Sequence, residues 1–166
     1  MKKPKKPTKR GGLPASTLPQ GIASFVSMLS LKTVRLVESC SKLSIADDKL
    51  PTELGVSVDV RIAVSGQGSK LLGNLVATLR TPNESESSIS IMVDIQCVFD
   101  VPSVPDVSSL PQDVRNDISA TVISIAWPYV RHHVHAMTAS MAVPPFTLPL
   151  FHVGMPPVIS SMVAGE

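Results

Sequence analysis

Two stretches of strict alternation between apolar and polar residues constrain the fold of this 166-residue chain most strongly. Every second residue is aliphatic in residues 56–64, and every second residue is apolar in residues 89–99. Successive side chains of a β-strand point to opposite faces of the sheet, so each stretch predicts a strand with one apolar face. A less regular stretch, residues 71–79, predicts a third strand between them.

The connections between these stretches indicate how the strands are arranged. Residues 66–69 and 82–87 are short polar turns, which favour an antiparallel meander. Residues 31–45 are a further extended segment, with apolar side chains on both faces. No helical pattern separates the strands, so a parallel α/β sheet is disfavoured.

A long helix is predicted after the strands. Apolar residues recur at helical spacing up to about Met141, with Ser109 expected as the N-terminal cap. Pro128 lies inside this segment and is expected to kink or divide the helix, because proline removes a backbone hydrogen bond. The predicted fold is therefore α+β, a four-stranded antiparallel meander-type sheet packed on a long proline-broken helix.

The composition suggests that part of the surface is covered. Charged residues are only 17% of the chain, against roughly 25% in an average domain. A folded surface with few charges is often covered by a second subunit or a ligand. We predict an oligomer interface along one helix face, formed by Val114, Ile118, Val122 and Ile125.

The charge distribution divides the chain. Residues 1–10 hold six of the 15 basic residues and none of the 13 acidic ones. We expect a disordered basic tail over residues 1–30, a folded domain over 31–153 and a short tail over 154–166. Pro14 and Pro19 interrupt the apolar run that a signal peptide needs, which predicts a cytoplasmic protein. The tail leaves open an adaptor that binds nucleic acid or acidic membrane by charge, although no aromatic residues accompany it for specific nucleic-acid binding.

No set of residues predicts catalysis, a metal or a cofactor. His132 and His135 can share a helix face, but no carboxylate or thiol lies within a turn to complete a metal site. The loop at residues 66–70 lacks the spacing of a phosphate-binding loop. Cys40 and Cys97 are predicted to be free buried thiols. We therefore expect that the protein is not an enzyme.

Three segments resemble the SecB family of export chaperones. Residues 125–131, Ile-Ala-Trp-Pro-Tyr-Val-Arg, resemble its helix motif of an apolar run followed by aromatic-Pro-Tyr-x-Arg. Residues 145–149, Pro-Phe-Thr-Leu-Pro, are similar to its crossover loop, and residues 94–99 to one of its strands. The likeness covers roughly residues 32–153.

This resemblance implies an ATP-independent chaperone, or holdase, that binds unfolded or non-native polypeptides and keeps them competent for export or assembly. It also implies a homotetramer, built as a dimer of dimers. We predict that the client groove is lined by apolar residues of one strand and of the crossover segment. These residues are Val56, Val58, Val60, Phe146, Leu148 and Phe151.

The resemblance leaves the partner open. In the family, an acidic sheet surface docks the SecA translocase motor, and Met92 and Asp94 match part of that surface. Lys42 and Ala46 stand where other acidic residues are expected, and the family's C-terminal helix is largely missing. SecB-like members that serve toxin–antitoxin systems show similar differences, so a chaperone dedicated to an antitoxin is the alternative.

Overall fold

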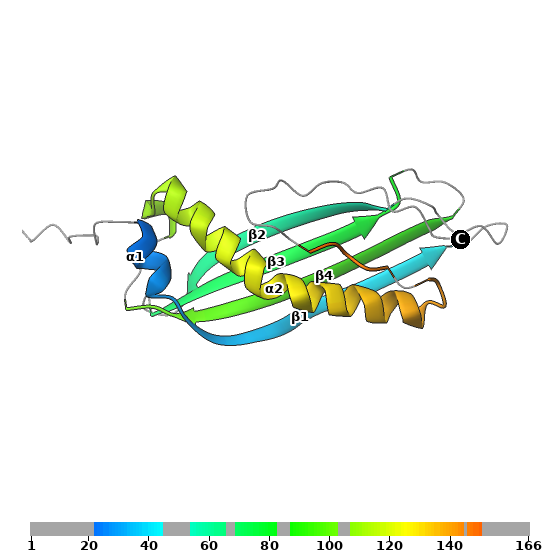
Figure 1. The fold of residues 1–166 in the computed structure, drawn as a ribbon, viewed down its shortest axis with the longest axis horizontal. Helices are drawn as coiled ribbons and strands as arrows, with labels where there is room; N and C mark the ends of the chain where they lie inside the picture. The colour runs from blue at the N-terminus through cyan, green and yellow to red at the C-terminus, as the bar shows by residue number, and fades with distance from the viewer. Residues whose placement is uncertain are drawn as a thin grey trace, which may run out of the picture.

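The computed structural model describes residues 22–44, 54–65, 69–82, 87–102, 107–144 and 146–150. Within them the chain forms two layers, a sheet and a long helix that crosses one face of it diagonally (Figure 1). In chain order the elements are α1 (Ile22–Ser27), β1 (Ser30–Ser44), β2 (Gly55–Ser65), β3 (Lys70–Arg80), β4 (Ser88–Asp100), the short 3₁₀ helix η1 (Val107–Ser109) and α2 (Gln112–Ser140). The predicted α+β class is confirmed.

The sheet is antiparallel, with the strand order β1-β4-β3-β2. The predicted meander is confirmed for β2, β3 and β4, which pair consecutively. However, β1 pairs with β4 and not with its neighbour in sequence, β2. A long connection that brings a fourth strand beside the far end of a three-strand meander is a Greek key.

One face of the sheet carries the core. Leu75 in the centre of β3 lies opposite Val60 on β2 and Ile95 on β4. Alternate residues on either side of these positions share the same face, as the strict alternation predicts. Leu71, Leu75, Ala77 and Leu79 of β3 and Ile91, Val93, Ile95, Cys97 and Phe99 of β4 are buried beneath α2.

The helix lies very close to the sheet at Gly73 of β3. A Cβ atom built on Gly73 would lie 2.3 Å from Cγ2 of Val122, which is too close for two carbon atoms. Only glycine leaves room for α2 at this point.

Apart from Trp127, the buried residues of α2 recur at every fourth position. Four residues turn an α-helix by about 400°, so the buried stripe moves around the helix by about 40° per turn. The stripe therefore passes through Ala126 and Val130, and not through the predicted Ile125 or through Tyr129, which lies one turn further along. Ile125 is only half-buried, and Tyr129 is 47% exposed.

One prediction about α2 is confirmed in part and another needs correction. The helix changes direction near its middle, as a kink requires (Figure 1), but it is continuous through Pro128 and is not divided there. Ser109 does not cap it, because Pro111 precedes the first turn and the helix has no side-chain cap bond at that residue. Instead, a carboxylate oxygen of Asp113 accepts a hydrogen bond from the backbone N–H of Val114 at 2.9 Å.

The folded part begins earlier than predicted. α1 lies within the segment expected to be a tail, yet it packs against α2 near the start of that helix (Figure 1). Phe25 and Leu29 pack against the main core. The remaining parts of the predicted tails, residues 1–21 and 154–166, lie outside the described residues. Neither α1 nor α2 is long and apolar enough to cross a membrane.

Candidate polypeptide-binding surfaces

The chain reverses direction after α2 and runs back along it. Ala142, which follows the helix, has a positive φ of 55°. Its N–H donates to the carbonyl of Ala139 at 3.2 Å, and the N–H of Val143 donates to that of Thr138 at 3.3 Å. Residues 146–150, which we call the strap, then lie on the side of α2 toward β2 and β3 (Figure 1).

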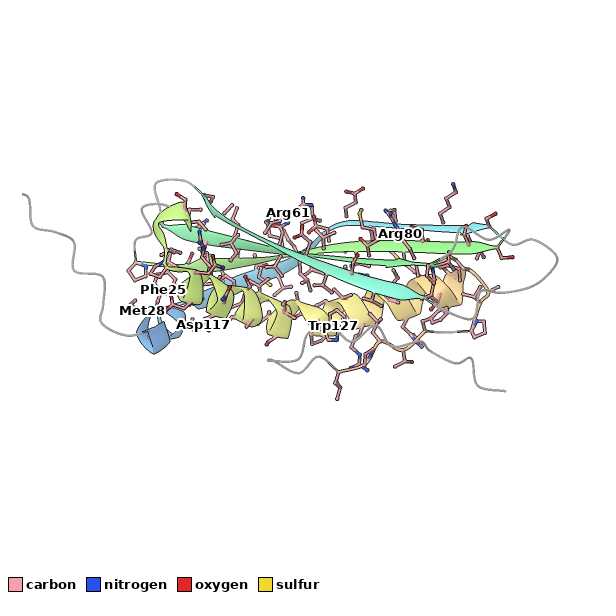
Figure 2. All side chains as sticks on the ribbon, turned by 90° about the horizontal axis from the view of Figure 1, so that it is seen from above. Phe25, Met28, Arg61, Arg80, Asp117 and Trp127 are labelled. Atoms are coloured by element: carbon pink, nitrogen blue, oxygen red, sulfur yellow. The ribbon has the colours of Figure 1, made fainter. Side chains whose placement is uncertain are left out.

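Two hydrogen bonds attach the strap to α2. The hydroxyl oxygen of Thr138 accepts from the backbone N–H of Phe146 at 3.2 Å. The indole N–H of Trp127 donates to the backbone carbonyl of Pro149 at 2.8 Å. Trp127 lies on the side of the molecule away from the sheet's open face (Figure 2). Both bonds join a helix side chain to the main chain of the strap.

The side chains of the first four residues of the strap alternate between more and less buried. Phe146 is half-buried and Leu148 is only 2% exposed. Thr147 and Pro149 are exposed, and Leu150 is 67% exposed. An extended segment that packs one face against a protein has this period of two.

Five of the six predicted groove residues lie in one apolar layer. Val56, Val58 and Val60 are half-buried on the α2 side of β2, and they pack against the same core as Phe146. Leu148 is already covered by the chain itself. Phe151 lies outside the described residues.

The predicted helix interface is occupied by the chain's own core. Ile118 and Val122 are fully buried and Val114 is nearly so, because all three face the sheet. They have no surface left for a second subunit. Ile125 is half-buried.

Sequence reasoning missed a group of exposed apolar residues on β1. Leu31, Leu36 and Val37 are 45%, 42% and 51% exposed. β1 is also an edge strand, paired on one side only. The signal in the sequence was the presence of apolar residues on both faces of this segment, which one sheet with a helix on a single face cannot cover.

The other face of the sheet, away from α2, is open and polar. Arg61 and Arg80 project from it (Figure 2). In its centre Arg35 donates to Gln96, Gln96 donates to Asn74 at 2.9 Å, and Asn74 donates to Asp94 at 3.0 Å.

The predicted docking residues lie on this open face. Met92 and Asp94 are both half-buried there. Lys42, on the neighbouring strand β1, is exposed on the same face opposite Ser90. Ala46 lies outside the described residues.

The two thiols differ from each other. Burial raises the pKa of Cys97 from 9.0 to about 11, so this thiol stays protonated at neutral pH. Cys40 is exposed on β1, which corrects the prediction that both are buried. The rings of His132 and His133 meet edge to face with centroids 5.7 Å apart, and the described residues contain no group of metal-binding side chains.

Comparison with known proteins defines the fold. The chain is similar to a SecB-like chaperone of Mycobacterium tuberculosis, solved in complex with a peptide from an antitoxin. The TM-score is 0.62 at 17% identity, over 78% of this chain and 92% of that one. A protein of unknown function from Streptococcus agalactiae matches with a TM-score of 0.41 and 10% identity, over 74% of this chain and 97% of that one.

No protein-family profile and no curated protein sequence matches the chain. The solved structure nevertheless confirms the resemblance at the level of the fold. The chain has the fold of the SecB-like chaperones.

Proposed function

We propose that this protein is an ATP-independent chaperone that binds an extended apolar segment of an antitoxin and holds it until the antitoxin can assemble. The observation that carries the proposal is the SecB-like fold, shared with a chaperone that was solved with an antitoxin peptide. A cytoplasmic location is part of the proposal.

The distribution of apolar surface supports binding of polypeptide. Val56, Val58 and Val60 form a half-buried row along an edge strand. Extended chains bind such edges through main-chain hydrogen bonds, while alternate side chains enter the apolar layer. Holding a chain in this way requires complementary surface and no reacting group.

General export is the second candidate, and one observation favours it. Met92 and Asp94 lie on the open face of the sheet, where a translocase motor could approach them. The exposed Lys42 on the same face introduces the opposite charge, whereas the exposed Glu38 lies opposite Asp94 and adds to the acidic character. The antitoxin-dedicated function has more support because the similar solved chaperone carries an antitoxin peptide.

We also propose that the chain works as a homo-oligomer, with a tetramer as the expected state. The exposed apolar residues of β1 support this part, in place of the predicted helix face. A second copy that pairs with β1 would cover Leu36 and Val37 and satisfy the free backbone groups of the edge.

The function is tested by co-purification and by binding. We expect the chain to co-purify with an antitoxin encoded beside its gene and to prevent aggregation of that antitoxin without ATP. If it protects unrelated secreted precursors equally well, general export is the better description. If it protects neither, the proposed function is wrong.

A matched pair of variants locates the binding surface. Val56→Thr with Val58→Thr removes apolar surface on the α2 side while keeping the side-chain shape. Val76→Thr makes the same change at a half-buried position of the open face. We expect several-fold weaker client binding for the double variant only. The opposite result would place the client on the open face.

The basic tail is tested separately. Deleting residues 1–20 should leave client binding unchanged, because this segment has too few apolar residues to form a binding surface. Loss of binding after this deletion, together with strong salt dependence in the full chain, would favour the charge-driven adaptor.

A further inference from the structure

We propose that the strap, residues 146–150, is an internal pseudo-client that fills the binding groove beside α2 and that a client must displace. The ligand is an extended polypeptide segment with bulky apolar side chains at alternate positions. The inference rests on the proposed function and adds the position and the chemistry of the groove.

The strap is held in the way that a protein holds an extended peptide. Trp127 donates to the main-chain carbonyl of Pro149, and Thr138 accepts from the main-chain N–H of Phe146. Every peptide offers main-chain groups of both kinds. The two anchors therefore bind a backbone and do not depend on the side chains of the strap.

The side chains of the strap show which sequences fit. Phe146 and Leu148 face the core, and Thr147 and Pro149 between and after them face solvent. The N–H anchor lies at the first of these four residues and the carbonyl anchor lies at the fourth. A client therefore needs bulky apolar residues at its first and third positions, a free N–H at the first and a free carbonyl at the fourth.

The strap is also built to detach. Residues 146–150 belong to no helix or strand, so they leave without breaking a backbone ladder. Their removal loses the burial of Leu148, the packing of Phe146 against the core and the two anchor bonds. A client with matching groups replaces these interactions, and a segment that fits better than the strap displaces it.

The thiol-free, fluorescently labelled peptide Pro-Pro-Phe-Thr-Leu-Pro-Leu, the sequence of residues 144–150, provides the direct probe. In the full-length chain the attached strap competes with this peptide at high effective concentration. We expect Leu148→Ser, which weakens only the strap, to increase the affinity for the peptide several-fold. Leu150→Ser makes the same change at an exposed position and should match the wild type.

The only tryptophan reports on the same event. A labelled peptide that takes the place of the strap brings its fluorophore close to Trp127, which lies against the strap, so added peptide should quench the tryptophan fluorescence of the wild type. Leu148→Val keeps an apolar side chain and covers the case in which Leu148→Ser does not fold. It should shift the affinity in the same direction by a smaller factor.

The possible outcomes separate the two proposals. Equal or weaker peptide binding by both Leu148 variants, compared with the wild type, overturns the pseudo-client. If the wild type still holds an antitoxin in that case, the proposed function stands without it. If the Leu148 variants gain affinity for the peptide but no form of the chain holds any protein client, the groove exists and the proposed function fails.

Discussion

β1 and β2 are the two edges of the same sheet, yet their surroundings differ. The apolar row of β2, from Val56 to Val64, is half-buried throughout on the α2 side. Of the 15 residues of β1, all but Val34 and Leu43 are exposed. α2 packs mainly on the two central strands, β3 and β4, and the strap lies on its β2 side (Figure 1). The chain therefore covers the β2 edge in part and leaves the β1 edge open.

The two edge strands therefore present different surfaces: the apolar row of β2 is half-buried, and most of β1 is exposed. β2 has a regular alternation that lets a helix cover one face. β1 has two irregularities in its register with β4 and charged residues between its apolar ones. A long exposed edge with apolar side chains invites pairing with another chain. We therefore assign subunit contact to the β1 side and client binding to the β2 side.

Aspartate substitution should lower the free energy of unfolding by very different amounts on the two edges. Val60→Asp places a charge against the core of the chain, so we expect a loss of about 2 kcal/mol or more in the free energy of unfolding. Leu36→Asp on β1 should cost less than half as much when measured by chemical denaturation at low protein concentration. Equal losses would show that β1 is covered within the single chain.

Gly73→Ala tests how tightly α2 covers the β2 side. The added methyl group would meet Val122, and overpacking of this kind typically costs about 1–3 kcal/mol. The double variant Gly73→Ala, Val122→Ala should recover part of the loss, because the clash is removed. Two independent, additive losses would contradict the close approach of helix and sheet.

Ala142→Gly tests the turn that directs the strap toward β2. Alanine at a φ of 55° is strained, and glycine adopts this conformation freely. We expect the free energy of unfolding to rise by about 0.5–1 kcal/mol. A decrease, in the same denaturation assay, would indicate that this turn is not formed in solution.

The two thiols should differ in their reactivity, because Cys40 is exposed and Cys97 is buried. At pH 8 a thiol reagent should modify Cys40 on β1 and leave Cys97 unmodified, because the thiolate reacts and the pKa of Cys97 is about 11. Modification of Cys40 should slow as the protein concentration rises, if a second copy covers β1. A rate independent of concentration would count against that contact.

The same pKa predicts a pH effect with a definite sign. The raised folded-state pKa of Cys97 leaves stability unchanged below pH 9 and lowers it between pH 9 and about 11, because the unfolded chain loses this proton first. Cys97→Ala should remove that part of the decline.

Much of the fold could be predicted because it depends on local pattern. The alternation around Val60 and Ile95 identified the strands and their buried face correctly. The helix from Gln112 was also predicted to nearly its full length. These features follow from the fixed periods of strands and helices.

The remaining features depend on contacts between distant parts of the chain. Ile125 was wrongly assigned to the buried face, because the spacing of apolar residues does not give the angle at which α2 crosses the sheet. α1 is short, and only packing against α2 makes Phe25 part of the core. Prolines in and beside the strap predict that it is not helical. Its hydrogen bonds to Trp127 and Thr138 follow only from the three-dimensional structure.

Equilibrium binding to an unfolded, fluorescently labelled antitoxin tests whether this chain holds unfolded polypeptide without an energy source. Fluorescence anisotropy should rise to saturation as the chain is added, with the same curve in the presence and absence of ATP. Competition by the folded antitoxin should be much weaker than competition by the unlabelled unfolded form. No saturable rise, or a rise that requires ATP, would contradict the account.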